Sequence, residues 1–307
     1  MDLEVHTPIL TDVVLELLDA KPGKRFIDAT VDGGGHARAL LARTAPDGKV
    51  LGIDRDSGLL DHTRRRLDSD LASERLTLVY GDFRNLEDIA HRHGFAEVDG
   101  ILFDLGLSSY HFDRSGRGFS FSGSEPLDMR FDPDDAEAES AADILASRRE
   151  EELSRLFFEL GEERYSRRIA RAVVRRRERA PVRLASELYE LVVGALPGPA
   201  RRHAARSAAR IFQALRIASN QELAAIEQAL PQALRLLRPD GRLVILAFHS
   251  LEDRIVKNFL RARKQAGEVE VLTKKPLRAS DEEVGRNPRA ASAKLRAARK
   301  IGTTPMS

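Results

Sequence analysis

Short apolar runs alternate with amphipathic stretches along the first third of the chain. Four runs are rich in Val, Ile, Leu and Phe, at residues 25–28, 49–54, 76–80 and 99–104. Such continuous runs predict strands that are buried on both faces, as in a parallel sheet. Between the runs, the chain carries apolar residues at helical spacing. This alternation predicts a doubly wound, Rossmann-like α/β sheet.

The alternation stops near residue 110. Residues 110–130 are rich in Ser, Gly and Asp and include several aromatic residues, which is typical of a functional loop. Residues 140–217 then show helical periodicity that is interrupted by prolines, with no convincing strand. We therefore expect an all-helical inserted domain at residues 110–216.

The strand pattern returns after the insertion. Residues 242–248 form another apolar run, and residues 269–273 and 292–301 are candidates for two further strands, the last of them antiparallel. These strands complete the sheet that the first half of the chain begins. We expect one discontinuous domain made of residues 1–109 and 217–307.

The amino-terminal region predicts a helix that precedes the sheet. Residues 7–20 are amphipathic, with Thr7 in the position of an N-cap and Pro8 at the first helical position. The dipeptide Pro22-Gly23 then separates this helix from the first strand.

A glycine-rich turn joins the first predicted strand to the next helix. The strand ends at Asp28, and Gly33, Gly34 and Gly35 follow shortly after it. Glycines permit positive φ angles and let a ligand approach the backbone closely. The helix that begins here presents free N–H groups to an anionic group. The turn is therefore a candidate ligand site, although such loops also occur as simple turns.

Two kinds of ligand can be compared for this turn, a dinucleotide and S-adenosylmethionine. A dinucleotide fingerprint needs a third glycine three residues after the second, and Arg38 occupies that position when Gly33 and Gly35 are the first two. Asp28 also suits a ligand with a cationic end. A cofactor with an ammonium and a carboxylate, such as S-adenosylmethionine, fits better than a pyrophosphate.

The other predicted strands also end in polar or glycine-bearing turns. The second ends at Asp54, placed 19 residues after Gly35, where a carboxylate can accept hydrogen bonds from both ribose hydroxyls. The third leads into Gly81-Asp82-Phe83, which suits an adenine, and the fourth ends at Asp104. Because the carboxyl ends of parallel strands meet at one edge, these residues predict a nucleoside-binding crevice.

Composition narrows the class of protein. The 307 residues include no cysteine, and the formal net charge is +2 with 32% charged residues. No apolar stretch is long enough to span a bilayer, and the acidic start lacks the layout of a signal peptide, so we expect a cytoplasmic protein with no membrane partner. No cluster of His, Asp and Glu has ligand spacing, so no metal is expected.

Arginines are concentrated in two stretches of the predicted insertion. One stretch spans residues 164–179 and the other residues 201–216, with an acidic block at residues 132–139 before them. This asymmetry indicates a polyanionic partner, and the alternative is a solvated helix surface.

The ordered motifs resemble one family. They are His6-Thr7-Pro8, the loop ending in His36, Ile53-Asp54-Arg55-Asp56, residues 99–109, Arg117-Gly-Phe-Ser-Phe121, Pro126-Leu-Asp-Met-Arg130, Gly161-Glu-Glu-Arg164, residues 212–217, Phe248-His-Ser-Leu-Glu-Asp-Arg254 and Asn287-Pro-Arg289. Together they resemble the bacterial small-subunit (16S) ribosomal RNA cytosine-N4-methyltransferases, the RsmH or MraW family, almost from end to end.

The resemblance implies a fold, a reaction and a set of site residues. It implies a class I methyltransferase sheet with a helical substrate-recognition insertion, and S-adenosyl-L-methionine as cofactor. The substrate implied is a cytidine in the decoding region of 16S rRNA, within the small ribosomal subunit or an assembly intermediate. The cofactor contacts carried over are Gly34, Gly35, His36, Asp54, Phe83, Asp104 and His111.

The chain departs from the family pattern at three places. His111 stands where many members have glutamine, and Val31-Asp32-Gly33 replaces a Phe-Gly that is followed by a polar or basic residue. Ile211 replaces a threonine in a common Arg-Thr-Phe, so a hydroxyl contact to RNA is expected to be missing there.

The expected chemistry assigns several catalytic candidates. The exocyclic amine of cytosine is a poor nucleophile, and a hydrogen-bond acceptor on its hydrogens favours attack. Amino-methylating enzymes often carry a proline-containing motif at the end of the fourth strand, and here Asp104-Leu-Gly-Leu-Ser108 stands there instead. Asp104 is the first candidate acceptor, with Ser108, Ser109 or a backbone carbonyl as alternatives. His249, at the end of the fifth strand, is a candidate for contact with the substrate base.

Several of these residues also have structural interpretations. Ser250 and Asp253 fit a helix cap as well as a site. Phe119 and Phe121 could stack on an extruded base, or anchor their loop to the core. The competing functions are an NAD-type oxidoreductase and a non-catalytic RNA-binding assembly factor. The oligomeric state is open, a homodimer included.

Overall fold

The computed structural model describes residues 8–121 and 123–302. The chain forms two compact units, one made of Met1–Ser108 with Leu223–Ser307 and the other of Ser109–Glu222. Within the described residues, no helix is long and apolar enough to cross a membrane. The predicted insertion limits of 110 and 216, and the role of the insertion in substrate recognition, stay predictions.

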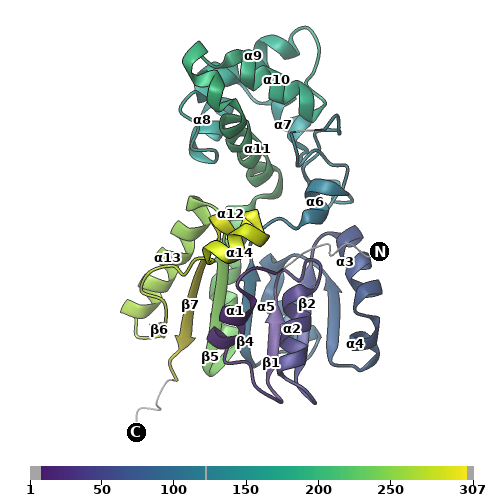
Figure 1. Ribbon diagram of the computed structural model, residues 1–307, viewed down its shortest axis with the longest axis vertical. Coiled ribbons are helices and arrows are strands. Elements are labelled where there is room, and N and C mark those ends of the chain that lie inside the picture. The colour runs from purple at the N-terminus through teal and green to yellow at the C-terminus, as the bar shows by residue number, and fades with distance from the viewer. Residues whose placement is uncertain (1–7, 122, 303–307) are drawn as a thin grey trace. The chain divides into compact units, whose positions relative to one another are not determined.

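The first unit is built on a seven-stranded sheet (Figure 1). Its strands are β1 (Arg25–Asp28), β2 (Lys49–Asp54), β3 (Leu76–Tyr80), β4 (Val98–Asp104), β5 (Leu237–Ala247), β6 (Val269–Val271) and β7 (Lys294–Lys300). Their order across the sheet is β3-β2-β1-β4-β5-β7-β6. The first five strands pair in parallel, whereas β7 runs antiparallel to both β5 and β6. The predicted doubly wound α/β class is confirmed, including the antiparallel strand near the carboxyl terminus.

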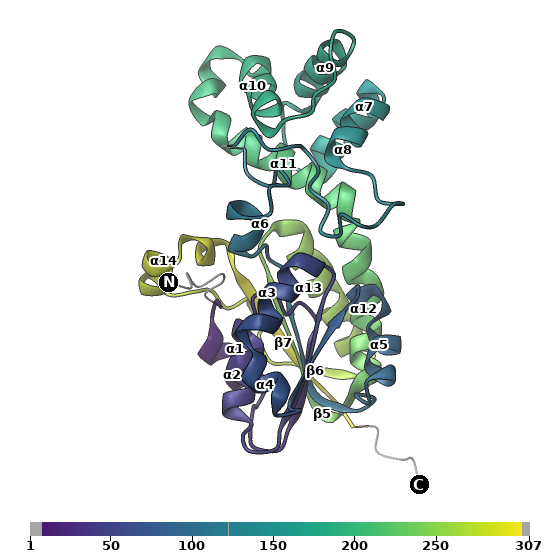
Figure 2. The same cartoon turned by 90° about the vertical axis from the view of Figure 1, so that its right-hand side faces the viewer.

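Helices cover both faces of this sheet (Figure 2). They are α1 (Thr11–Leu17), α2 (Gly35–Arg43), α3 (Ser57–Arg66), α4 (Asp68–Ala72), α5 (Leu86–Arg92), α12 (Glu222–Leu236), α13 (Ser250–Gln265) and α14 (Asp281–Arg286), with single turns η1 (Phe83–Asn85) and η3 (Pro288–Ser292). Side chains of successive strand residues point to opposite faces of the sheet. Ile27 belongs to the hydrophobic core on the face covered by α5, α12 and α13, whereas Phe26 belongs to the core on the face covered by α1, α2 and α3. This double burial explains why the strands read as continuous apolar runs.

Among the described residues of the second unit, all regular elements are helices, and an isolated β-bridge joins Pro126 to Leu184. The helices are α6 (Ser109–Asp113), α7 (Ala141–Ser147), α8 (Glu150–Glu159), α9 (Ser166–Arg177), α10 (Ala185–Ala195), η2 (Gly198–His203) and α11 (Ala204–Asn220). Asn220 anchors the long loop before α7, since its side-chain amide donates to the Met129 carbonyl at 2.7 Å and its oxygen accepts from the Phe131 N–H at 2.8 Å. The loop is thus fixed from within the unit.

Two predicted elements differ from the structure. The amino-terminal helix begins at Thr11, because Leu10 adopts a left-handed φ of 56° and Pro8 precedes the helix; Thr7 lies outside the described residues. The stretch expected as a continuous loop at 110–130 contains the short helix α6. Both differences depend on local backbone geometry that apolar periodicity does not encode.

Candidate active site

Three carboxylates end three strands of the first unit. Asp28 ends β1, and the strands on either side of β1 end at Asp54 (β2) and Asp104 (β4). Burial raises the pKa of Asp28 well above its usual range, and the negative charge of Asp104 adds to the rise. Within the part of the chain that the structure describes, the Asp28 Oδ2 atom is buried without a hydrogen-bond partner. A buried acidic site of this kind favours a ligand with a positive charge.

Contacts with α3 fix the backbone of the glycine turn. Gly34 caps α2 with a φ of 75°, and a Cβ atom there would lie 2.5 Å from Leu67 Cδ1. Helix α3 holds the turn in place: the Thr63 hydroxyl donates to the Asp32 carbonyl at 2.5 Å, and Arg66 donates to the Gly33 carbonyl at 3.0 Å. The predicted need for glycine therefore has a packing cause in addition to ligand approach.

Gly34→Ala is expected to destabilise the protein by about 2–4 kcal/mol, because alanine adds both a left-handed strain and a contact with Leu67. Urea unfolding measures this loss, and calorimetry with S-adenosylmethionine measures the accompanying loss of affinity. Gly94→Ala is the matched control, since Gly94 has a φ of 74° and open space around it. The control should lose only about 1 kcal/mol and keep the cofactor. Equal losses in both variants would contradict the packing argument.

Asp54 is oriented by two backbone N–H groups. Its Oδ2 atom accepts from Asp32 N and its Oδ1 atom from Asp56 N, both at 2.9 Å. Burial raises the pKa of Asp54 to about 6 against these hydrogen bonds, and the charge of Asp56 adds to the rise. Each carboxylate oxygen keeps a second lone pair for a hydroxyl donor. The sequence offers no role for Asp32. In the structure its backbone N–H orients the Asp54 carboxylate, and the φ of Asp32 is 47°.

Asp104 and His36 meet inside the same unit. His36 Nε2 lies 3.4 Å from Asp104 Oδ2, and both side chains are buried. The Asp104 N–H donates to the Thr30 hydroxyl at 2.7 Å, which ties the end of β4 to the turn after β1. Gly35 begins α2, directly before His36, and a Cβ there would lie 2.9 Å from the Pro8 ring. The structure therefore brings four of the predicted residues together: Gly34, Gly35, His36 and Asp104.

Phe83 and Ser108 take positions at the same ends of the strands. Phe83 begins η1 after β3 and packs edge-on against Phe103 of β4, with ring centroids 5.7 Å apart. The preceding Asp82 caps this turn by accepting from Arg84 N at 2.8 Å, and it pairs with Arg55 at 3.3 Å. Ser108 follows β4 and is fully buried. The partial exposure of Phe83 leaves part of its ring available for an adenine.

The structure makes His249 the N-cap of α13, whereas the sequence pattern suggests Ser250. The His249 Nδ1 atom accepts from Glu252 N at 3.4 Å. The Glu252 carboxylate accepts in return from Phe248 N at 2.7 Å and from His249 N at 3.2 Å. Ser250 is therefore not the N-cap, and Asp253 instead pairs with Arg296 at 2.6 Å. Spacing from Ser250 points to Asp253, so the sequence pattern does not identify Glu252 as the capping carboxylate.

His111 belongs to the second unit, where it lies in an aromatic cluster. Its ring meets Phe119 edge-on at 5.3 Å and Phe131 at 5.1 Å, and these two phenyl rings stack at 5.6 Å. Phe121 stacks on Tyr189 at 5.4 Å. These contacts favour the anchoring interpretation of Phe119 and Phe121 over base stacking. The predicted contact of His111 with the cofactor stays a prediction.

The chain is similar to a large set of methylases. A sequence model of the MraW methylase family matches residues 4–301. The ribosomal RNA small subunit methyltransferase H of Carboxydothermus hydrogenoformans is 43% identical, with 96% of this chain and 98% of the relative covered. The proteins of that name from Thermomicrobium roseum and Deinococcus deserti are 46% and 45% identical, with 96% and 97% of this chain and 94% of each relative covered. The chain belongs to the MraW methylase family, and S-adenosylmethionine is its cofactor.

Proposed function

We propose that this protein transfers a methyl group from S-adenosylmethionine to the N4 amine of one cytidine in the decoding region of small-subunit rRNA. The observation that carries the proposal is the near full-length similarity to proteins named ribosomal RNA small subunit methyltransferase H. The cytosine N4 position is supported by the resemblance of the ordered motifs to cytosine-N4-methyltransferases. The cytoplasm is the proposed location.

The residues at the strand ends fit the cofactor. Asp54 would accept hydrogen bonds from the ribose hydroxyls, and Phe83 would contact the adenine. Gly34, Gly35 and His36 would line the methionine part, next to Asp104. The buried, partnerless Oδ2 atom of Asp28 is the group that the cofactor ammonium would satisfy. When bound, the cofactor supplies a methyl group on a sulfonium, which is a good leaving group.

The remaining task of the protein is to activate the amine. The cytosine N4 lone pair is delocalised into the ring, so an acceptor on its hydrogens must favour attack and then receive a proton. Asp104 is the acceptor we favour, because its carboxylate is buried at the end of β4 beside His36. Ser108 and His249 are the other candidates. The capping bond to His249 Nδ1 makes a proton-transfer role for that nitrogen less favourable.

The chain offers evidence against one of the two competing functions, and the other has to be tested by turnover. An NAD-type oxidoreductase needs a small residue at position 38, and Arg38 stands there, in the first turn of α2. Membership of a methylase family also counts against it. A non-catalytic assembly factor would bind the cofactor without turnover, so turnover is the measurement that separates it from the enzyme.

The test uses small subunits isolated from cells that lack the modification. Incubation with cofactor carrying a labelled methyl group should label one cytidine, and nucleoside chromatography should identify the product as N4-methylcytidine. The Asp54→Asn variant is the matched negative control. A label on a ring carbon or on protein would refute the proposed reaction. Absence of turnover on subunits, assembly intermediates and naked rRNA would favour the assembly factor.

A further inference from the structure

The arginines of α9 fall into two groups. Arg177 donates to the carbonyls of Leu145 and Arg148 at 2.8 and 2.6 Å, and Arg176 pairs with Glu187 at 3.1 Å. These two side chains join α9 to its neighbours and are structural. The second group is exposed and consists of Arg167, Arg168, Arg171 and Arg175. Within it, Arg168 also donates to the Ala195 carbonyl of α10 at 3.0 Å.

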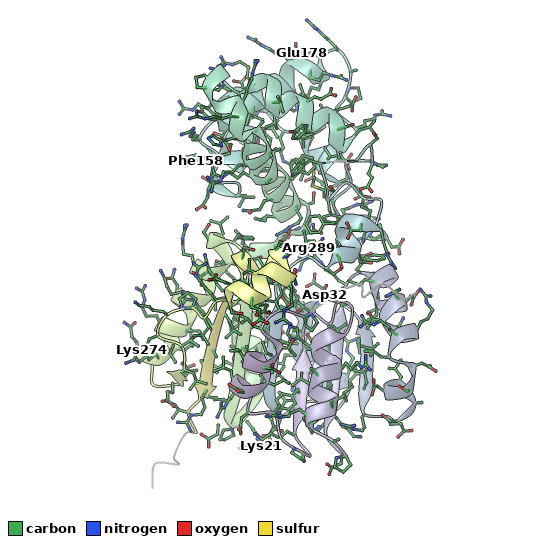
Figure 3. All side chains as sticks on the ribbon, viewed as in Figure 1. Lys21, Asp32, Phe158, Glu178, Lys274 and Arg289 are labelled. Atoms are coloured by element: carbon green, nitrogen blue, oxygen red, sulfur yellow. The ribbon has the colours of Figure 1, made fainter. Side chains whose placement is uncertain are left out.

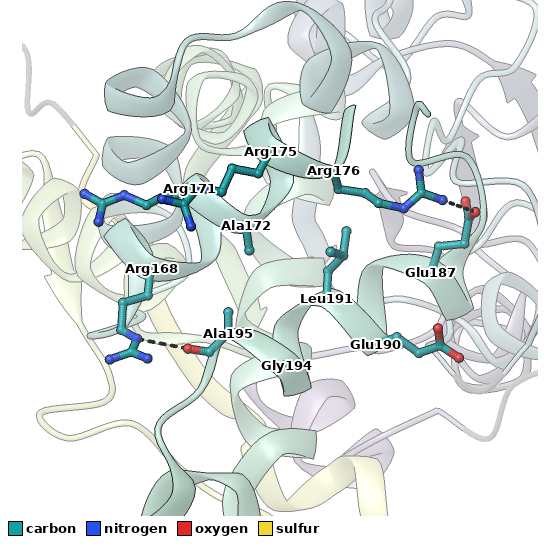
Figure 4. Close-up of a pocket in the computed structure, with 10 residues that line it drawn as sticks. All are labelled: Arg168, Arg171, Ala172, Arg175, Arg176, Glu187, Glu190, Leu191, Gly194 and Ala195. Atoms are coloured by element: carbon teal, nitrogen blue, oxygen red, sulfur yellow. Dashed lines mark hydrogen bonds and ion pairs between the residues drawn. The ribbon is translucent and has the colours of Figure 1, made fainter. Parts of the chain in front are cut away.

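The exposed group lines grooves on both sides of α9. A groove of about 740 Å³ lies between α9 and α10, and its lining includes Arg168, Arg171 and Arg175 of α9 and Glu190 and Gly194 of α10 (Figure 4). A second groove of about 700 Å³ lies between α8 and α9. Its wall carries five arginines and two glutamates, namely Arg155, Arg164, Arg167, Arg168, Arg171, Glu150 and Glu151. Arginine therefore outnumbers glutamate in the groove between α8 and α9.

An exposed phenylalanine lies in the second groove. Phe158 is 62% exposed and stands on α8 (Figure 3). Among the described residues, the other exposed large apolar side chains are Tyr80, Leu277 and Ile301, all in the sheet unit. Phe158 is thus an exposed aromatic ring among charged side chains, in a groove that Tyr165 also lines. Nearby, the Arg164 guanidinium covers the Tyr165 ring at 4.7 Å from its centroid.

We propose that this face of the helical unit binds a single-stranded segment of small-subunit rRNA. The surface, which we name the α8–α9 surface, consists of Arg155, Phe158, Arg164, Arg167, Arg168, Arg171 and Arg175. Phe158 stacks on an unpaired base and the guanidinium groups contact phosphates. The inference rests on the proposed function for the source of the RNA. It adds an anchoring site to the helical unit, separate from the strand ends that hold the cofactor.

The chemistry of the surface favours RNA over a protein partner. A protein interface needs a contiguous apolar centre, and Phe158 has no exposed apolar neighbour among the described residues of its unit. A base needs only one aromatic face flanked by cations. The ion pair between Arg171 and Glu150, at 3.2 Å, is weak because the two side chains are 59% and 33% exposed. A phosphate can therefore replace Glu150 at little cost.

The first test measures RNA binding by the full chain. The probe is a fluorescein-labelled, unstructured 12-nucleotide oligouridine, followed by anisotropy between 50 and 300 mM salt. The triple variant Arg155→Gln, Arg167→Gln, Arg175→Gln should lower the slope of log affinity against log salt by about 2, since each lost phosphate contact accounts for about 0.7. The matched control removes three exposed arginines from the sheet unit: Arg92→Gln, Arg261→Gln, Arg286→Gln. The control should keep the slope.

The second test isolates the aromatic ring. Phe158→Ala should weaken oligouridine binding by about tenfold or more, because one base loses its stacking partner. Phe158→Trp should restore the affinity, whereas Leu277→Ala, another exposed apolar truncation, should leave it unchanged. Both phenylalanine variants should fold normally, since the ring is exposed. Equal affinity of Phe158→Ala and the unmodified protein would overturn the role of Phe158.

Turnover separates this inference from the proposed function. With unmodified small subunits as substrate, the triple variant should raise KM at least fivefold and keep kcat, because the surface binds and does not react. A higher KM with unchanged oligouridine binding would overturn the inference in favour of a ribosomal protein partner. Unchanged KM and unchanged binding would overturn it outright. If the unmodified protein methylates no cytidine while the variants still lose RNA affinity, the proposed function fails and the RNA surface stands.

Discussion

Asp104→Asn is expected to lower the rate of methyl transfer by about 10²–10⁴-fold, because asparagine cannot accept the amine proton. The substitution preserves side-chain shape, and the backbone N–H of this residue can still donate to the Thr30 hydroxyl. Single-turnover measurements with saturating cofactor and small subunits isolate the chemical step. Calorimetry with S-adenosylmethionine then tells whether the carboxylate also contributes to cofactor binding.

Asp99→Asn is the control for this result. Asp99 lies near the start of the same strand, where its Oδ2 atom accepts from Arg25 N at 2.9 Å and it pairs with Arg238. The control should lose stability and keep the single-turnover rate. An unchanged rate for Asp104→Asn would remove Asp104 from the mechanism and direct attention to Ser108 and His249.

The sheet could be predicted from the sequence because its strands are buried on both faces. Phe26 and Ile27 enter opposite cores, so neither position could be polar, and the run is recognisable without its partners. The acids that end β2 and β4 could be predicted for the same reason, since each follows such a run directly. The glycine turn was also recognisable, although its contact with Leu67 depends on the packing of α3.

Other features depend on contacts between distant residues. The N-cap of α13 is His249 because Glu252 reaches back to two N–H groups, and Ser250 was an equally good candidate on spacing alone. Phe121 meets Tyr189, which lies 68 positions away in the sequence, so the sequence left anchoring and base stacking equally open. The division of the α9 arginines into structural and exposed groups likewise follows from the positions of Leu145, Arg148 and Glu187.

Asp54→Asn is expected to weaken S-adenosylmethionine binding by about 100-fold or more, because two hydroxyl-to-carboxylate hydrogen bonds are replaced by weaker contacts. In the unmodified protein the affinity should fall below about pH 6, where the Asp54 carboxylate takes up a proton. Calorimetric titration between pH 5 and 8 measures both effects. The variant should lose most of this pH dependence. An affinity that stays constant from pH 8 to pH 5 in the unmodified protein would contradict the ribose role of the carboxylate.

The stability of the cofactor-free protein supplies an independent test of the same carboxylate. A pKa of about 6 in the folded state, against the usual 3.8, means that the folded protein holds this proton more tightly than the unfolded chain. The free energy of unfolding should therefore fall as pH rises from about 4 to about 6, and this contribution should stay constant above that range. The free energy of unfolding should fall by at most about 3 kcal/mol through this carboxyl group. Solvent access to the Asp54 carboxyl group makes the fall smaller.

Burial also raises the pKa values of Asp28 and Asp32 well above their usual range, so both carboxyl groups contribute to the fall in the same direction. Urea unfolding at pH 4.5 and pH 7 should give a smaller difference for Asp54→Asn than for the unmodified protein, because the variant keeps the contributions of Asp28 and Asp32 only. The cofactor would bring its ammonium to Asp28 and its ribose hydroxyls to Asp54, and both contacts favour the ionised carboxylates, so added S-adenosylmethionine should stabilise the protein more at pH 7.5 than at pH 5. A stabilisation that is equal at the two pH values would contradict both the ammonium contact of Asp28 and the ribose contact of Asp54.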